Sequence, residues 1–405
     1  MIPLEEARAE VLAACPPRQP VSMNAADSLG LVLAEAVYAT EPVPPFANTA
    51  MDGYAVRAQD VAAATEAAPA RLRVVGTVAA GHAPAVPVGP GEALRIMTGA
   101  PFPAGADAVA IVETTSTDGA DVLVTAPASA GVHVRPAGED IEVGQEVFAA
   151  GEVLGPGHIG VLCSIGSEKV TVVPAPVVGV LSTGDELVEG ATALLPGQIR
   201  DSNRYTLMSL LRRDGIPVVD LGIARDDEAD IERAVMEGVA RCDAVLTSGG
   251  VSMGDFDYVK GVLDRIGRMH WMQVAIRPAK PFAFGVVGTT PVFGLPGNPV
   301  SSMVSYEVLA RPGLRRMAGY REDDLVRSAV QAVADSKLGA GRDGRTTFVR
   351  VRSNFGPDGR VHVSSTGGQG SHQLHAMALA DALAVLPPER DASPGDEIDL
   401  IFLGS

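Results

Sequence analysis

The sequence predicts a multidomain protein in which a central α/β domain with a mostly parallel sheet is flanked by smaller β domains. Its 405 residues exceed the roughly 150 residues of one compact domain. Between positions 174 and 318, apolar strand-like runs alternate with helix-like runs, whereas short strand-like runs separated by glycine and proline fill most of the remainder. Because 46% of the residues are apolar and only 4% are aromatic, the cores must be built mainly from aliphatic side chains.

The first 173 residues predict one helix followed by β structure. An amphipathic run over 4–14 ends at Pro16 and Pro17, which cannot continue a helix. Residues 155–160 have the spacing of a dinucleotide-binding loop, but Pro156 lies inside it and no strand–helix unit surrounds it, so we interpret this motif as an ordinary loop. Strands are expected at 71–78, 108–112, 122–125, 146–148 and 169–173.

The middle segment predicts a parallel sheet, because its strands are apolar throughout and are separated by helices. Ligands bind such sheets at the carboxyl ends of the strands, so a site is expected there. After about residue 319 the chain returns to β structure, with strands at 347–352, 361–364 and 398–402 and a helix-like run at 372–384. The middle strands are expected at 177–181, 218–221, 244–247, 282–287 and 292–295, and the helices at 202–213, 227–240, 257–266 and 299–309.

The charge distribution limits the possible partners. The formal net charge is −17, of which residues 1–172 carry −12 with 8 basic and 20 acidic residues, whereas residues 173–318 are near neutral with 15 and 17. This acidity argues against a nucleic-acid or anionic-membrane binder, although a small anion can still be held by the near-neutral segment. The three distant cysteines form no disulfide framework, and neither a signal peptide nor a membrane span is visible. We therefore expect a soluble, cytoplasmic protein.

The first of four candidate ligand-binding turns follows the strand at 177–181. In this turn, Gly184 allows the backbone to approach a ligand closely, and the Thr183 hydroxyl can donate to an anion. Asp185 and Glu186 can hold a divalent cation. By itself, a helix-capping loop explains this motif equally well.

The second turn, residues 247–254, contains three glycines and three hydroxyl side chains between a buried strand and a helix. Such a turn is typical of a phosphate site made of backbone N–H groups at a helix N-terminus. Asp255 and Asp257 follow directly and would repel a bare phosphate, so Mg²⁺ is expected between them and the ligand. A flexible linker is the weaker alternative, because it would not need so many hydroxyl groups.

The third turn, residues 295–302, predicts a rigid helix start with free N–H groups, since Asn298 can be the N-cap and Pro299 the first helical residue. In the fourth turn, Arg277 and Lys280 place two cations on a proline-stiffened segment. An ordinary cap and two solvated cations are the simple alternatives. His372 and His375 share a possible helical face, but without a further ligand nearby we interpret them as exposed or capping residues rather than zinc ligands.

Taken together, six short strings resemble the MoeA family of molybdopterin molybdenumtransferases, which is related to the C-terminal part of gephyrin. They follow one another in the family's order along most of the chain, and Arg350 and Ser371 extend the resemblance into the last segment. The family commonly has lysines where this chain has Gln273 and Arg277, so Arg277 keeps the positive charge at its position and Gln273 does not. The strings are residues 50–54, 95–100, 138–141, 182–187, 248–252 and 295–301.

The resemblance implies a homodimer of four-domain subunits that inserts molybdate into the dithiolene of adenylylated molybdopterin, with Mg²⁺-dependent release of AMP. It also implies transient contact with other proteins of molybdenum cofactor synthesis. The implied domains are an elongated N-terminal α+β domain (1–46 with 140–172), an inserted β domain (47–139) that leans across the cleft from the partner subunit, a three-layer α/β/α molybdopterin-binding domain (173–318) and a C-terminal β-barrel (319–405).

Carried over position by position, the resemblance and the turns assign three sets of residues. The expected metal ligands are Glu186 and Asp257. The expected catalytic residues are Glu186, Asp257, Asp52, Thr98 and Asp140. The expected substrate-binding residues are Thr183, Gly184, Asp185, Asp226, Ser248, Gly249, Gly250, Ser252, Arg277, Lys280, Pro296, Gly297, Asn298, Ser301, Arg350 and Ser371.

Two other functions stay open at this point. A molybdopterin adenylyltransferase would share the sheet domain, but the β segments on both sides count against it, because the sheet domain alone would suffice. A non-catalytic, gephyrin-like scaffold would need a groove for a partner peptide and would leave the carboxylates unexplained.

Overall fold

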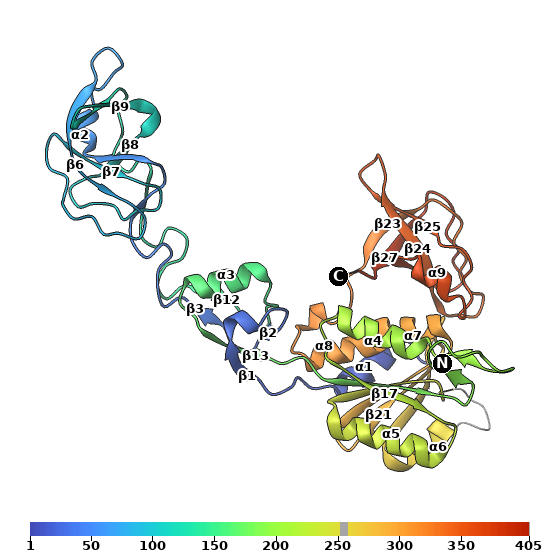
Figure 1. Ribbon diagram of the computed structural model, residues 1–405. Coiled ribbons are helices and arrows are strands. Elements are labelled where there is room, and N and C mark those ends of the chain that lie inside the picture. Colours follow the sequence, from blue (N-terminus) through green and yellow to red (C-terminus); the bar gives the residue numbers. More distant parts are fainter. Residues whose placement is uncertain (252–257, 405) are drawn as a thin grey trace.

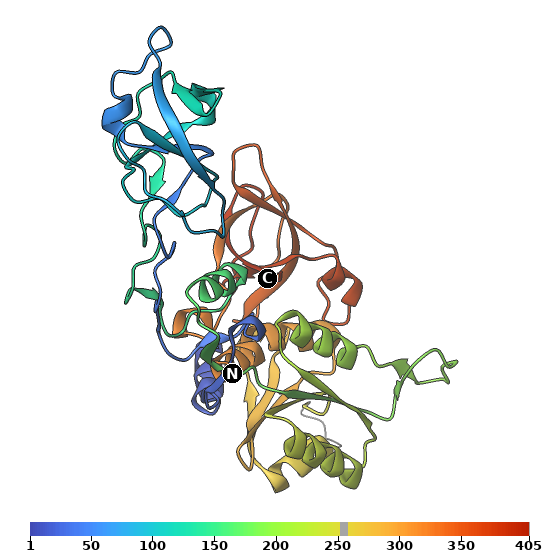
Figure 2. The same cartoon turned by 60° about the vertical axis from the view of Figure 1, so that its left-hand side comes forward.

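The computed structural model describes residues 1–251 and 258–404. The chain forms an elongated molecule with a sheet domain and a β-barrel at one end and a β domain at the other (Figure 1). The turned view shows the same separation between the far β domain and the sheet domain (Figure 2). Among the described residues, no helix is both long and apolar enough to cross a membrane.

The central sheet has six strands in the order β17-β14-β18-β22-β21-β19. All five predicted strands form. The first four in this order are parallel, β21 runs antiparallel to them, and β19, which pairs antiparallel with β21, runs in the same direction as the first four. The edge strand β19 was not predicted, because its polar residues alternate with only half-buried ones and give no apolar run. The bounds are β14 Val178–Thr183, β17 Val218–Ala224, β18 Ala244–Ser248, β19 Arg268–Gln273, β21 Pro281–Val287 and β22 Thr290–Leu295.

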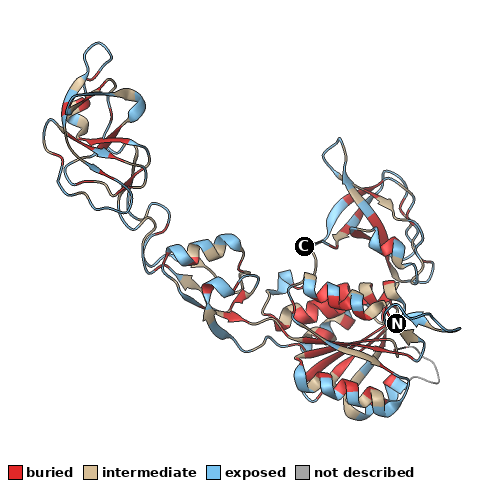
Figure 3. Cartoon of the chain, viewed as in Figure 1, coloured by how far each residue is buried: buried red, intermediate tan, exposed pale blue. Residues whose placement is uncertain are grey.

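Both faces of this sheet are packed with apolar residues, and most of its strands are therefore coloured red, as buried, in Figure 3. Within β18, Ala244 and Leu246 pack into one core cluster and Val245 into the other, because successive side chains of a strand point to opposite faces. One face is covered by α1, α4, α7 and α8, and the other by α5 and α6 (Figure 1). The bounds are α1 Leu4–Ala13, α4 Asn203–Arg213, α5 Glu228–Arg241, α6 Tyr258–Ile266, α7 Pro299–Ser305 and α8 Arg311–Met317.

The first helix, α1, packs onto the sheet domain although it begins the chain. Ala7 and Val11 are fully buried in the same cluster as α4 and α7. Gly313 of α8 permits the close approach, because a Cβ there would lie 2.7 Å from Val11 Cγ1. The predicted helix 299–309 continues beyond α7 as a π-turn, Tyr306–Ala310, which leads directly into α8.

The elongated domain is formed by two separate parts of the chain and contains a helix, α3, that was not predicted. Residues 155–160, interpreted as a loop, are the N-cap and first turn of α3 (Pro156–Ser164). Pro156 is tolerated there because the first helical residue needs no N–H group, and His158 Nδ1 accepts a hydrogen bond from Gly155 N at 3.1 Å. The other elements are β1 Val21–Asn24, β2 Val32–Leu33, β3 Val37–Tyr38, β12 Glu146–Phe148 and β13 Lys169–Val173.

The far β domain is a curled six-stranded sheet in the order β8-β5-β7-β6-β10-β9, with a short helix, α2 (Ala58–Val61). A two-stranded ribbon, β4 with β11, lies at its base. The bounds are β4 Asn48–Thr49, β5 Gly53–Val56, β6 Ala70–Val78, β7 Glu92–Ile96, β8 Ala108–Ile111, β9 Thr115–Asp118, β10 Asp121–Val124 and β11 Val134–Arg135.

The C-terminal domain is a closed barrel, because β24 pairs with both β25 and β26 and thereby completes a ring of five strands. The predicted helix 372–384 is much shorter, since only α9 (Leu374–Ala378) is helical and β26 begins at Ala382. Strand β20 (Ile276–Arg277) of the sheet domain pairs with β24 and joins the two domains. The bounds are β23 Val330–Ala334, β24 Thr346–Phe355, β25 Val361–Ser365, β26 Ala382–Leu386 and β27 Glu397–Phe402.

Candidate functional site

A cavity of about 390 Å³ lies at the carboxyl ends of β14, β18 and β22, where the sequence predicts the site. Six predicted site residues line it, and two residues of the C-terminal domain, His372 and Leu374, form part of its wall. The six are Thr183, Glu186, Ser248, Gly249, Gly297 and Asn298. A neighbouring arm, β15 (Leu187–Val188) with β16 (Ile199–Arg200), contributes Leu187, Ile199 and Arg200.

The first turn places the Glu186 carboxylate in the cavity. Gly184 has a φ of +144°, which favours glycine, and a Cβ there would lie 2.4 Å from Glu186 Oε2, so a larger residue would displace this carboxylate. Asp185 and Asp226 lie side by side: Asp185 N donates to Asp226 Oδ2 at 3.4 Å, and Asp226 N donates to Asp185 Oδ1 at 3.3 Å. Their carboxylates thus hold the ends of β14 and β17 together.

Gly249 of the second turn lies close to Thr183 of the first, where a Cβ would be 2.9 Å from Thr183 O. Gly249 and Gly250 have φ values of +98° and +65°, in the left-handed region. Gly249 N donates to Leu295 O at 3.1 Å, so this N–H group extends the sheet and does not join the predicted phosphate cradle. Ser252 and Asp257 lie outside the described residues.

Replacement of Gly249 by alanine is expected to destabilise the sheet domain by roughly 1–3 kcal/mol, because the residue is held at positive φ and the new Cβ would lie 2.9 Å from Thr183 O. Gly288→Ala is the matched control, since Gly288 has a φ of +63° but nothing within 4 Å of its Cβ position. Urea unfolding should show a larger loss for Gly249→Ala; equal losses would mean that the close approach to Thr183 carries no cost.

The third turn begins α7 as predicted, but two of its N–H groups are already bonded within the protein. Val300 N donates to Ser371 O at 3.0 Å, and Ser302 N donates to Asn298 O at 2.9 Å. Asn298 is the N-cap residue, yet its side chain makes no capping hydrogen bond and lines the cavity instead. Pro296 and Ser301 also belong to this turn, and Ser301 is buried.

The C-terminal barrel closes one side of the cavity through a loop that Arg350 organises. Arg350 is only 1% exposed, and its Nη2 donates to Gly368 O at 2.8 Å and to Gly370 O at 3.2 Å. Burial lowers the pKa of its guanidinium. The loop continues into Ser371 and into His372, which is exposed, as expected, and forms part of the cavity wall. Arg350 thus supports the wall from behind.

Two predicted cations do not line this cavity. The Arg277 guanidinium lies against the loop at Gly341, whose Cβ would be 2.6 Å from Arg277 Nη1. Lys280 follows in the turn before β21, and its carbonyl accepts a hydrogen bond from Val274 N at 2.8 Å. Arg277 therefore lies at the contact between the sheet domain and the barrel.

Asp52 directly precedes β5 and Thr98 follows β7, so both lie in the far β domain, which Figure 1 shows well separated from the sheet domain. Thr98 donates to Asp52 Oδ1 through its backbone N–H at 2.6 Å and through its hydroxyl at 2.7 Å. Both bonds lower the pKa of the Asp52 carboxyl, and the backbone bond has the larger effect. Asp140 lies in the chain leading out of this domain, where its N–H donates to Val43 O at 2.9 Å.

Thr98→Val is expected to raise the pKa of Asp52 towards its ordinary value, because it removes the hydroxyl donor and keeps the backbone donor. Since the folded-state pKa lies below the unfolded one, these bonds favour folding above about pH 4 and lose their effect as the pH falls through the folded-state pKa. A carboxyl ¹³C NMR titration of Asp52 checks this, with Thr117→Val on β9 as the control. An unchanged Asp52 pKa would contradict the assignment.

Sequence reasoning missed a buried polar cluster at the start of α4. Asp201 and Asn203 line the cavity, and Arg204 beneath them is only 2% exposed. Arg204 Nε donates to Asp201 Oδ2 at 2.9 Å, and the guanidinium also pairs with Glu189 and Asp220. The available signal was the run of polar residues 200–204 directly before the apolar part of a helix.

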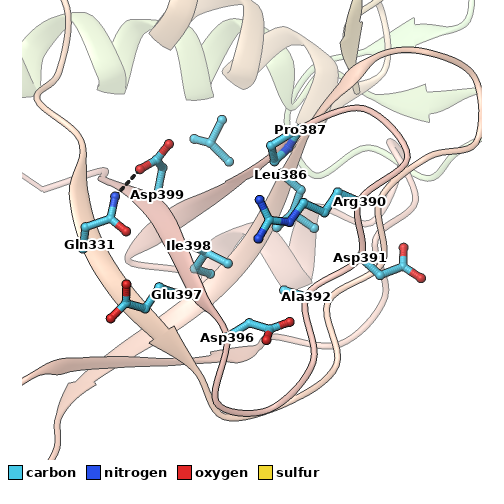
Figure 4. Close-up of a pocket in the computed structure, with 11 residues that line it drawn as sticks. Gln331, Leu386, Pro387, Arg390, Asp391, Ala392, Asp396, Glu397, Ile398 and Asp399 are labelled. Carbon is cyan, nitrogen blue, oxygen red and sulfur yellow. Dashed lines mark hydrogen bonds between the residues drawn. The ribbon is translucent and has the colours of Figure 1, made fainter.

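A second cavity, about 210 Å³, lies on the barrel (Figure 4). Its carboxylates are engaged with neighbouring side chains: Asp399 accepts from Gln331, Asp391 accepts from Arg342 at 2.8 Å, and Glu397 accepts from Arg360. It contains none of the predicted site residues. The strand-end cavity is therefore the candidate site.

Two carboxylates line the cavity among the described residues, but that of Asp201 is already bonded to Ser182 and Arg204, so Glu186 is the candidate ligand for Mg²⁺. Among residues 1–251 and 258–404, no group of three or more His, Cys, Asp or Glu side chains could hold a metal ion. Mg²⁺ in proteins is commonly bound by one or two carboxylates, with substrate phosphates and water as its other ligands. Glu186 is therefore a suitable protein ligand for this ion.

A ligand cavity at the carboxyl ends of parallel strands, walled by hydroxyl, amide and carboxylate groups and closed by a second domain, defines a multidomain enzyme for a polar small molecule. Three family models match the chain in order: the MoeA N-terminal region (domain I and II) at residues 2–166, a probable molybdopterin-binding domain at 179–316, and the MoeA C-terminal region (domain IV) at 337–403. The chain belongs to the MoeA family.

Individual relatives agree with this assignment. The chain is 37% identical to a molybdopterin molybdenumtransferase of Haemophilus influenzae, covering 99% of this chain and 98% of the relative. It is 38% identical to molybdopterin molybdenumtransferase 2 of Mycobacterium tuberculosis, covering 94% and 93%. A crystal structure of the molybdopterin biosynthesis MoeA protein from Pyrococcus horikoshii superposes with a TM-score of 0.81 at 32% identity, covering 100% of both chains. The family resemblance and the fold class predicted from the sequence are confirmed.

Proposed function

We propose that this protein is a transferase of molybdenum cofactor biosynthesis that inserts molybdate into the dithiolene of adenylylated molybdopterin, with Mg²⁺-dependent release of AMP. The observation that carries the proposal is the cavity at the carboxyl ends of β14, β18 and β22, which is lined by hydroxyl and amide residues together with Glu186. Full-length similarity to proteins named molybdopterin molybdenumtransferase supports the same reaction.

In this proposal the residues of the chain bind and orient two anionic substrates. The Thr183 and Ser248 hydroxyls and the Asn298 amide can donate hydrogen bonds to phosphate or molybdate oxygens. The barrel loop around His372 covers one side of the cavity and limits the access of water. Mg²⁺, when held by Glu186 and Asp257, would neutralise charge on the phosphoryl linkage. Positioning of the two substrates then supplies most of the catalysis.

The proposed enzyme acts as a cytoplasmic homodimer. Asp52 and Thr98 form a compact acidic site in the inserted domain, which lies far from the cavity of the same chain (Figure 1). A second copy whose inserted domain reached across the cleft would bring this pair to the substrate, and Asp140 would approach from the same side. Domain boundaries at 1–46 with 140–172, 47–139, 173–318 and 319–405 remain part of this proposal, as do transient contacts with other proteins of molybdenum cofactor synthesis.

The decisive experiment incubates the purified protein with adenylylated molybdopterin, Mg²⁺ and molybdate. AMP release together with formation of active cofactor is expected. Consumption of ATP with unmodified molybdopterin would instead indicate a molybdopterin adenylyltransferase. Absence of both reactions in a protein that binds molybdopterin would indicate a non-catalytic scaffold.

A further inference from the structure

The amide of Asn203 joins two of the turns that form the cavity. Its Nδ2 donates to Ser248 Oγ at 2.8 Å and to Gly297 O at 2.7 Å. Because a carbonyl oxygen can only accept a hydrogen bond, Nδ2 must face Gly297, which settles the orientation of the amide. Both N–H hydrogens of the side chain are therefore used within the protein.

The neighbouring residues hold Asn203 in this position. Asp201 Oδ1 accepts from Ser182 Oγ at 3.0 Å and from Arg204 N at 3.2 Å, which ties the start of α4 to the end of β14. The Arg204 guanidinium fixes the other carboxylate oxygen of Asp201. The start of α4 is thus bonded to the ends of three strands, and Asn203 is held rigidly on the cavity wall.

The group of Asn203 that remains for a ligand is Oδ1, which only accepts hydrogen bonds. No hydrogen bond within the described part of the chain reaches this oxygen, although Asn203 lines the cavity. Phosphate and molybdate oxygens carry no donor at neutral pH and would be repelled by it. The ligand group opposite Oδ1 must therefore be an N–H or O–H donor.

We propose that Asn203 is a substrate-binding residue whose Oδ1 accepts a hydrogen bond from the donor-bearing edge of a nitrogen heterocycle. Amino and ring N–H groups of a pterin have this chemistry, so the inference rests on the proposed function and adds a residue that distinguishes the heterocycle from the anionic part of the substrate. The bonds to Ser248 and Gly297 orient the acceptor before the ligand arrives, which reduces the entropy lost on binding.

The test measures equilibrium binding of molybdopterin and, separately, of AMP to wild-type protein and to Asn203→Ala. The variant is expected to raise the Kd for molybdopterin about tenfold and the Kd for AMP less than twofold, because the inference places the pterin, and not the amino group of adenine, opposite Oδ1. A larger loss for AMP than for molybdopterin would place adenine there and overturn the inference. In turnover, KM for adenylylated molybdopterin should rise while kcat changes little, since the bond forms equally in ground and transition states. Ser209→Ala, on the exposed face of α4, is the matched control and should change neither constant.

The outcomes separate this inference from the proposed function. Equal weakening of molybdopterin and AMP would show that Asn203 only supports the turns, and unchanged binding of both would show that it has no role; either result overturns the inference. Wild-type protein that binds molybdopterin but forms no molybdenum cofactor contradicts the proposed function alone. Wild-type protein that does not bind molybdopterin contradicts both.

Discussion

Replacement of Glu186 by glutamine is expected to lower molybdenum insertion at low molybdate by roughly a hundredfold while the fold stays intact. Glu186 supplies a carboxylate that lines the strand-end cavity with Thr183 and Ser248, whereas the other carboxylate there, that of Asp201, is bonded to Ser182 and Arg204. Glutamine has the same shape but no charge, so it holds a divalent cation poorly. The Gly184 backbone, which leaves room for the carboxylate, leaves room for the amide as well.

The measurement is steady-state formation of active cofactor from adenylylated molybdopterin as molybdate is varied, together with a thermal unfolding curve. Glu237→Gln is the matched control, because Glu237 lies exposed on α5, on the other face of the sheet, where it pairs only with Arg241. This control should keep the wild-type rate. A Glu186→Gln protein that turns over at the wild-type rate would show that the central carboxylate is assigned wrongly.

Replacement of Arg204 by methionine is expected to destabilise the sheet domain by about 3–5 kcal/mol. Its guanidinium is 2% exposed, and the side chain of its partner Asp201 is 1% exposed. Removal of the cation leaves the Asp201 carboxylate buried without a counter-charge, which costs far more than a surface ion pair contributes. The partners Glu189 and Asp220 are about half exposed, so water can solvate them and they add little to the loss.

Urea unfolding followed by far-UV circular dichroism measures this loss in the transition of the sheet domain. Arg233→Met is the control, because the Arg233 side chain is 67% exposed and pairs with Asp230 on the surface of α5, so little change is expected. The double variant Arg204→Met with Asp201→Asn should recover part of the stability, since no buried charge is then left. A single variant as stable as the wild type would contradict the inferred role of this cluster.

Most helices and strands of the sheet domain could be predicted from the local pattern of apolar and polar residues. The strands β14, β18 and β22 are fully buried and mostly apolar, β14 and β18 end in hydroxyl residues, and a Pro–Gly turn follows β22, so both the sheet and the edge that bears the candidate site could be predicted. Strand β19 could not, because an edge strand exposes one side and its sequence lacks an apolar run. Helix α3 was missed because a proline and two glycines obscure its pattern, although proline is acceptable at a helix start.

The candidate site could be predicted only in part. Thr183, Glu186, Ser248, Gly249, Gly297 and Asn298 share the cavity because the carboxyl ends of parallel strands meet at one edge. Asn203 and His372 could not be foreseen, because one depends on the packing of α4 against the strand ends and the other on the docking of the barrel. The availability of backbone N–H groups was also overestimated, since Val300 N is bonded to Ser371 O and Gly249 N to Leu295 O.

The sequence by itself therefore determined the multidomain α/β and β architecture, the strand-end location of the candidate site and the family, because these depend on apolar periodicity and on short motifs that are local in the chain. The tertiary structure decided which side chains meet. It packs α1 onto the sheet domain, buries Arg204 under the cavity, and separates Asp52 and Thr98 from the cavity of their own chain. These contacts join residues far apart in sequence, so they depend on how whole elements pack and not on any local pattern.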